Sequence, residues 1–176
     1  MKTKIRRLAL GGTAGVAFLA IAGCPEVAPD DTTPPPSGPT AATLFARVTE
    51  TDPFQQWAQF PEAQGVIESA APHGPMGRVW INSVVESALT DPAGTLPTDS
   101  IILKESLSNS TAEKANEWDI MWKVSDFDAD NNDWFWVNVT PDGDVVAEGK
   151  IGGCIACHSG ARDNDFVFLH AFSGGN

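Results

Sequence analysis

The sequence contains no tyrosine, only three cysteines and few basic residues. Without tyrosine, a phenolate is excluded as a metal ligand. The cysteines lie at positions 24, 154 and 157, so no second close pair of thiols exists to complete a zinc site. The 11 Lys and Arg residues stand against 23 Asp and Glu residues, which gives a formal charge of −12. This balance argues against nucleic acid as a partner.

Long apolar runs are also lacking, except near the N-terminus. Four basic residues at positions 2, 4, 6 and 7 precede an apolar stretch at residues 8–22, which is too short and too rich in glycine for a membrane-spanning helix. The stretch ends in Ile21-Ala22-Gly23-Cys24, which has the form of a bacterial lipobox. We therefore expect residues 1–23 to be a lipoprotein signal peptide and Cys24 to be the lipid attachment site. The alternative is an ordinary secretory signal, and either signal exports the chain.

Residues 24–40 are rich in Pro, Asp, Thr, Ser and Gly and include three consecutive prolines. Such a segment buries little and is typical of an extended, disordered tether. The folded domain is expected at residues 41–176, a length that suits one core. Cleavage before Cys24 would change the formal charge to −16. Pro25 stands where an inner-membrane lipoprotein carries aspartate, which favours a lipid anchor in the outer membrane of the cell envelope, facing the periplasm.

Hydrophobic patterning in residues 41–176 predicts more strands than helices. Residues 44–60 are expected to form one or two short helices, interrupted at Pro53. Ser83, with Glu86 three residues later, has the form of a capping box that opens a further helix. Strands are predicted at residues 78–81, 100–107, 118–125, 134–139 and 145–150. The expected fold class is α+β, predominantly an antiparallel β-sheet with short flanking helices.

The most informative motif is Cys154-Ile155-Ala156-Cys157-His158. A CxxCH motif attaches one c-type haem covalently, because two intervening residues bring both thiols to the vinyl groups of one porphyrin. The adjacent His158 then supplies an axial ligand to the iron. A thioredoxin-like redox pair fits less well, because only 18 residues follow His158 and a βαβ unit needs more. We therefore expect a mono-haem c-type cytochrome.

The second axial position of the iron has several candidate ligands: His73, Met76, Met121 and His170. A side chain there would give a six-coordinate site suited to electron transfer, whereas an open position would bind small molecules. His73 lies in a Pro-His-Gly-Pro turn and is interpreted as a surface residue. His170 lies in a Phe-rich segment and is interpreted as a core residue.

Four short strings, in their order along the chain, resemble the cytochrome P460 family. They are Arg-Val-Trp-Ile-Asn at 78–82, Ile-Ile-Leu-Lys-Glu at 101–105, Asp-Trp-Phe-Trp at 133–136, and the CxxCH followed by Asp-Phe-Val-Phe at 165–168. The resemblance implies an antiparallel β-sheet haem protein, usually a homodimer, with the cytochromes c′-beta as a related branch. Ordinary helical cytochromes c carry their CxxCH near the N-terminus, so its late position here agrees with this resemblance.

The resemblance also implies roles for three residues. Lys104 matches the lysine that is bonded to a porphyrin meso carbon in cytochrome P460, and the c′-beta branch lacks this bond. The alternative for Lys104 is a strand lysine whose ammonium reaches solvent. Arg78 and Asp119 match an arginine and a carboxylate that the family places over the distal face of the haem. Strand alternation sets Asp119 on the face opposite Trp118 and Ile120, toward either haem or water.

The function implied by the resemblance is redox chemistry on a small nitrogen compound, either hydroxylamine oxidation or nitric oxide binding. His158 would be the proximal ligand, Arg78 a distal hydrogen-bond donor and Asp119 a proton acceptor. The alternative is a non-enzymatic electron-transfer or gas-binding cytochrome of the c′-beta type. The expected partners are a small-molecule substrate or gas and a redox partner protein, for which the acidic charge favours a basic surface.

Overall fold

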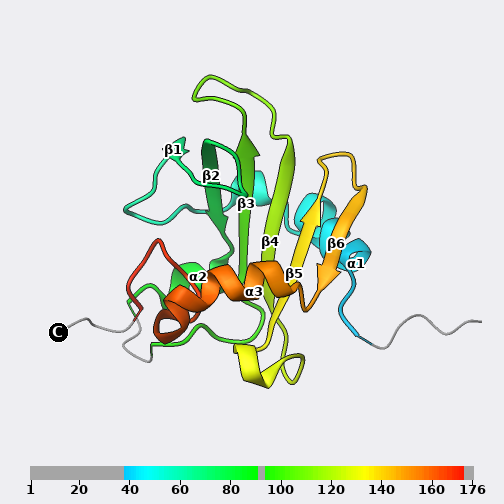
Figure 1. The fold of residues 1–176 in the computed structure, drawn as a ribbon, viewed down its shortest axis with the longest axis vertical. Helices are drawn as coiled ribbons and strands as arrows, with labels where there is room; N and C mark the ends of the chain where they lie inside the picture. The colour runs from blue at the N-terminus through cyan, green and yellow to red at the C-terminus, as the bar shows by residue number, and fades with distance from the viewer. Residues whose placement is uncertain (1–37, 91–93, 173–176) are drawn as a thin grey trace, which may run out of the picture. The chain divides into compact units, whose positions relative to one another are not determined.

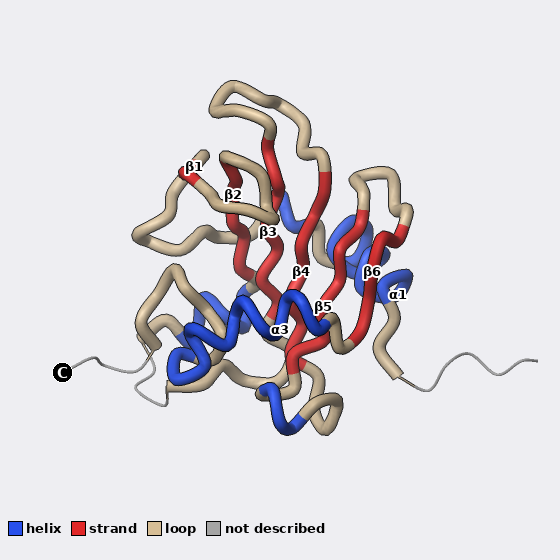
Figure 2. Tube along the Cα trace, in the orientation of Figure 1, coloured by secondary structure: helices blue, strands red, loops and turns tan. Residues whose placement is uncertain are grey.

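A computed structural model describes residues 38–90 and 94–172, which form one antiparallel sheet with helices on both faces (Figure 1). The expected signal peptide, Cys24 and nearly all of the tether lie outside the described residues. The strands pair in the order in which they occur in the sequence (Figure 2): β1 (Ile67–Glu68), β2 (Met76–Ile81), β3 (Ile101–Leu107), β4 (Glu117–Lys123), β5 (Trp134–Val139) and β6 (Val145–Gly149). The predicted fold class is confirmed. None of the helices in the described ranges is long and apolar enough to cross a membrane.

Alternation along the strands gives the sheet two buried faces. In β4, Trp118 and Ile120 pack into one hydrophobic cluster and Met121 into the other, as the strand phase predicts. The face that contains Met121 packs against α2 (Ser83–Ala88) and α3 (Gly152–His158), and we call it the α3 face. The opposite face, called the α1 face, packs against α1 (Ala41–Ala46). Figure 1 shows α3 crossing in front of the sheet and α1 behind it.

Short helical segments cover the α1 face, as the pattern of residues 44–60 predicts. After α1 come a π-helical turn, Arg47–Thr51, and a 3-10 turn, Phe54–Gln56. Thr40 caps α1, because its hydroxyl accepts a hydrogen bond from the backbone N–H of Thr43. Pro53 lies between the two later turns, where its missing N–H prevents one continuous helix.

The capping residue of α2 is Asn82, and not Ser83 as the capping box predicts. The Asn82 side-chain oxygen accepts from the backbone N–H of Val85 at 3.2 Å and from that of Ile101 at 3.1 Å. The second bond ties the helix start to β3. A buried amide that satisfies two backbone donors explains why Asn82 takes the cap position.

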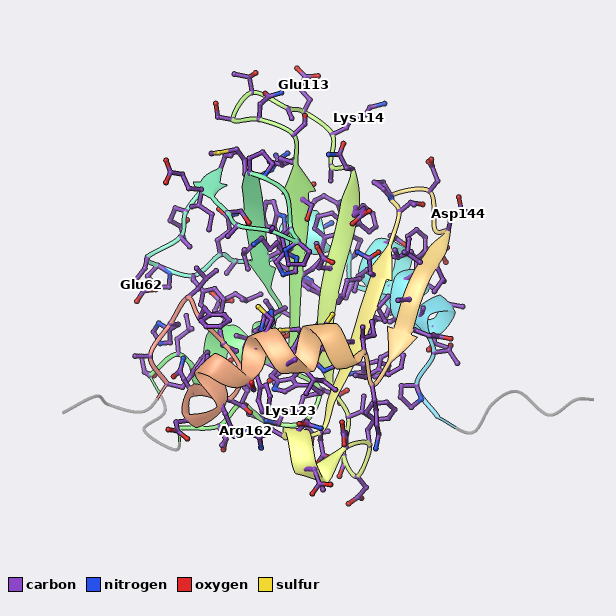
Figure 3. The ribbon with its side chains drawn as sticks, viewed as in Figure 1. Glu62, Glu113, Lys114, Lys123, Asp144 and Arg162 are labelled. Atoms are coloured by element: carbon purple, nitrogen blue, oxygen red, sulfur yellow. The ribbon has the colours of Figure 1, made fainter. Side chains whose placement is uncertain are left out.

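Asp165 fastens the C-terminal segment to the α3 face. Its fully buried carboxylate accepts from the Lys123 ammonium at 2.6 and 2.8 Å and from the backbone N–H of Leu96 at 2.7 Å. The indole of Trp134 donates to the backbone carbonyl of Asp165 at 2.9 Å. Lys123, labelled in Figure 3, is the last residue of β4. These bonds fix the point at which the chain returns to the sheet after α3.

One strand escapes sequence analysis. β1 contains only Ile67 and Glu68, which pair with Gly77 and Met76 of β2. Two residues are too few to show an alternating pattern. This short strand matters for the functional site, because its pairing with β2 fixes where the loop between the two strands begins.

Candidate functional site

The α3 face contains a cavity of about 350 Å³, bounded by the sheet, by α3 and by the segments that precede β2 and follow α3. Most of its lining is apolar. Several elements contribute the remaining side chains that carry chemistry: His73, Lys104, Asp119, Trp136, Cys154, Cys157 and His158. An apolar cavity with a few convergent polar groups is the usual form of a cofactor site.

α3 presents both thiols of the CxxCH motif to this cavity. Cys154 and Cys157 are three residues apart on the helix, so their side chains lie on the same helical face. They are free cysteines and not a disulfide. Burial raises the pKa of Cys154, and the negative charge of Asp119 acts in the same direction. A raised pKa is the opposite of what an active redox thiol requires.

His158 is held in one orientation at the end of α3. Its Nδ1 lies 2.8 Å from the backbone carbonyl oxygen of Phe166, and its ring packs on Trp136 with centroids 4.9 Å apart. A carbonyl oxygen can only accept, so Nδ1 carries the proton and Nε2 keeps its lone pair. Burial lowers the pKa of His158 and favours the neutral imidazole that metal binding requires.

Lys104 lies beside Asp119 on the wall that the sheet contributes to the cavity, since the two residues are register partners in β3 and β4. The Lys104 ammonium donates to the Ser69 hydroxyl at 2.6 Å. Its stem passes over Gly77, where an added Cβ would come within 2.9 Å of the lysine Cε. Burial lowers the pKa of Lys104, and the Asp119 carboxylate opposes part of that shift. The side chain therefore lies in the cavity wall instead of reaching into solvent.

Asp119 accepts three hydrogen bonds. The donors are the Asn138 amide at 2.7 Å, the His73 ring at 2.8 Å and the Ser106 hydroxyl at 2.9 Å. Burial by itself would raise the pKa of Asp119, but the bonds from His73, Asn138 and Ser106 outweigh this and lower the pKa. The carboxylate is therefore ionised at neutral pH.

His73 belongs to the site, although its turn sequence favours a surface position. Its side chain is 19 % exposed, and its ring centroid lies 6.2 Å from that of His158. The sequence names His73 as one of four candidate axial ligands but favours a surface position for it, because its segment is irregular and the direction of that segment depends on β1. One signal in the sequence does point to the site. His73 comes just before β2, and β2 contributes Gly77, which leaves room for the Lys104 side chain in the cavity wall.

Arg78 lies on the α1 face, away from the cavity. In the pairing of β2 with β3, Arg78 is opposite Glu105, whereas Val79 is opposite Lys104. The Arg78 Nε lies 3.2 Å from the Glu105 carboxylate, which also accepts from the Trp80 indole at 2.9 Å. The sheet therefore separates the Arg78 side chain from the cavity, and the structure does not bring Arg78 together with the other residues expected at the site.

The other candidate axial ligands differ in position. His170 engages both ring nitrogens within the protein, Nδ1 with Glu62 and Nε2 with the Leu89 carbonyl, each at 3.1 Å. This agrees with its interpretation as a core residue. Met121 lines the cavity from β4, whereas Met76, at the start of β2, is not part of the lining.

The fold and the site together define a class, the β-sheet cytochromes. The residues fit a haem: two unpaired thiols lie one helical turn apart on the wall of an apolar cavity, next to a neutral histidine with a free Nε2. The cytochrome P460 family matches residues 53–169, and the chain belongs to this family. The matched range contains the whole sheet and the CxxCH motif. No curated protein matches the sequence.

Proposed function

We propose that the cavity binds one haem c, joined to Cys154 and Cys157 by thioethers, with His158 as the proximal ligand. The observation that carries this proposal is the orientation of α3, which turns both thiols and the imidazole toward one apolar cavity. When bound, the haem supplies an iron that exchanges electrons and coordinates small molecules. The protein then positions the haem and provides polar groups around it.

The reaction we propose is redox chemistry on a small nitrogen compound, either hydroxylamine oxidation or nitric oxide binding. The support is a pair of charged side chains, Lys104 and Asp119, on the sheet wall of an otherwise apolar cavity. Hydroxylamine loses protons together with the electrons that pass to an external acceptor. The ionised carboxylate of Asp119 accepts such a proton, which is the role of a general base.

Lys104 is the side chain we assign to a covalent bond with a porphyrin meso carbon. The new N–C bond replaces one N–H bond of the amine and the C–H bond of the meso carbon, and the two protons and two electrons released pass to an external two-electron oxidant such as a peroxide, which is reduced to water. Because burial lowers its pKa, a larger share of the amine is neutral, and the neutral amine is the form that can make a new bond. A non-enzymatic electron-transfer or gas-binding cytochrome of the c′-beta type is the second candidate. The closeness of His73 to His158 favours it, because a second imidazole at the iron suits electron transfer.

The cellular setting is also part of the proposal. Residues 21–24 support export and a lipid anchor at Cys24, and Pro25 supports the outer membrane, with the protein facing the periplasm. The excess of acidic residues supports a basic redox protein as the electron acceptor. Family membership supports a homodimer.

The test uses holoprotein produced with a haem-attachment system. Hydroxylamine and a soluble one-electron acceptor are added, and reduction of the acceptor is followed by absorbance. Saturable turnover that falls in Asp119→Ala and persists in Glu105→Gln supports the enzyme. Nitric oxide binding to the ferrous protein without turnover supports the gas-binding function. Failure of both reactions in haem-loaded protein would overturn the proposal.

A further inference from the structure

Two histidines, His73 and His158, line the same cavity with their ring centroids 6.2 Å apart. We infer that Nε2 of His73 is the second axial ligand of the haem iron in the resting protein, opposite His158, and that Asp119 holds the His73 ring in place. The inference rests on the proposed haem. It adds to the proposed function a side chain that a substrate must displace.

The separation of the two rings matches that of two ligands on one metal. An imidazole nitrogen binds a metal at about 2 Å, so two such nitrogens on opposite sides are about 4 Å apart and the ring centroids about 6 Å. The observed centroid distance is 6.2 Å. The ring planes are 85° apart. Rings at right angles to one another can both stand perpendicular to a single porphyrin plane.

The hydrogen bonds leave the same atom free in both histidines. Nδ1 of His158 donates to the Phe166 carbonyl, and Nδ1 of His73 donates to the ionised Asp119. Among the described residues, neither Nε2 makes a hydrogen bond. Metal-bound histidines almost always donate their other ring N–H to a carbonyl or a carboxylate. A simple aromatic contact between the two rings would explain their distance. It would not explain why, in both rings, Nδ1 is hydrogen-bonded and Nε2 is free.

Asp119 is well placed as the positioning residue. Its other hydrogen bonds come from Ser106 in β3 and Asn138 in β5, the strands on either side of β4. The carboxylate is therefore fixed by the sheet while it orients the His73 ring. An imidazole that donates to a carboxylate is a more basic ligand and stabilises the oxidised metal.

This arrangement gives hydroxylamine and nitric oxide a competitor within the protein. If the form with His73 dissociated is populated at about 1 %, external ligands bind about 100-fold more weakly than to an open site. Ligand binding is then limited by departure of His73. The site is a six-coordinate centre at rest and a reactive one after ligand exchange.

The first experiment compares absorption and electron paramagnetic resonance spectra of ferric holoprotein. Wild type is expected to be six-coordinate and low-spin. His73→Ala is expected to be high-spin, and added imidazole to restore the low-spin spectrum. His170→Gln is the matched control and keeps the wild-type spectrum, because the ring nitrogens of His170 are occupied within the protein. A high-spin wild type, or a low-spin His73→Ala, overturns the inference, as does loss of the low-spin state in Met121→Leu alone.

The second experiment measures cyanide affinity and reduction potential. His73→Ala is expected to bind cyanide about 10- to 1,000-fold more tightly than wild type, as the competitor is removed. Asp119→Asn is expected to remain low-spin with a higher reduction potential, a shift that a merely structural role would not produce. Equal cyanide affinities in wild type and His73→Ala overturn the inference. A high-spin wild type that still oxidises hydroxylamine overturns only this inference, whereas protein without haem overturns the proposed function as well.

Discussion

The two faces of the sheet carry similar charged pairs at neighbouring register positions. The two pairs differ in the partners that bind their charges. On the α1 face, Arg78 and Glu105 neutralise each other. On the α3 face, Lys104 donates to Ser69, while Asp119 accepts from His73 and from neutral donors. Charges that neutralise each other serve the fold, whereas charges held by separate partners keep their chemistry available to a ligand.

The largest expected effect concerns the wall formed by α3. Replacement of both thiols in Cys154→Ser with Cys157→Ser is expected to abolish covalent haem, because serine forms no thioether. The haem that survives acidified organic solvent should fall from one per wild-type chain to none. Far-UV circular dichroism is the control for the sheet. Loss of haem from intact wild type under the same extraction would contradict covalent attachment.

The next effect compares one carboxylate from each face. Asp119→Ala is expected to slow hydroxylamine oxidation by about 10²–10⁴, the range for a positioned acid or base. Asp119→Glu should keep part of the rate, since a carboxylate remains on a longer arm. Glu105→Gln is expected to leave the rate unchanged, because Glu105 faces Arg78 across the sheet from the cavity. An unchanged rate in Asp119→Ala with normal haem loading would remove Asp119 from the mechanism.

A smaller effect is expected to distinguish Lys104 from Arg78, the basic residues of the two charged pairs. Mass spectrometry of digested holoprotein is expected to find the peptide around Lys104 linked through the porphyrin to the peptide of residues 154–158. Lys104→Gln should lose this link and shift the main absorption band back toward ordinary c-type positions, while Arg78→Gln should change neither. Haem on the CxxCH peptide alone would show that the protein is of the c′-beta type.

The smallest effect on the haem site is expected from Cys24→Ser. The variant should move from the membrane fraction to the soluble fraction, because no lipid can be attached. Its haem content and absorption spectrum should equal those of wild type, since Cys24 lies outside the domain that holds the haem. Retention of the variant in the membrane fraction would contradict the anchor.

Strand positions could be predicted from the sequence because the strands are rich in β-branched and aromatic residues and turn residues separate several of them. Each of the five predicted strands lies within a residue or two of β2 to β6. The alternation of β4 also placed Asp119 correctly relative to Trp118. What alternation does not reveal is which face carries the cavity, since both faces bury large apolar side chains.

That ambiguity accounts for the placement of Arg78, whereas the position of His73 has a separate cause. Arg78 was assigned by resemblance, although the phase of β2 sets it apart from Val79, which faces the cavity. His73 lies outside any regular strand, so no periodicity could orient it. Its position depends on a two-residue strand and on a hydrogen bond to a residue 46 positions later in the chain. Contacts of such long range are not visible as a local pattern.

The order of the strands has a consequence for how the protein is assembled. Each strand pairs with the strand before it in the chain, so the sheet grows by pairing neighbours in sequence, although α2 lies between β2 and β3. α3 follows β6 and comes after the whole sheet in the chain. The five antiparallel pairings involve only residues that precede Cys154, so none of them requires α3 or the segment after it. Maturation is therefore the closure of α3 and the segment that follows it, together with the cofactor, onto a wall built entirely from earlier residues.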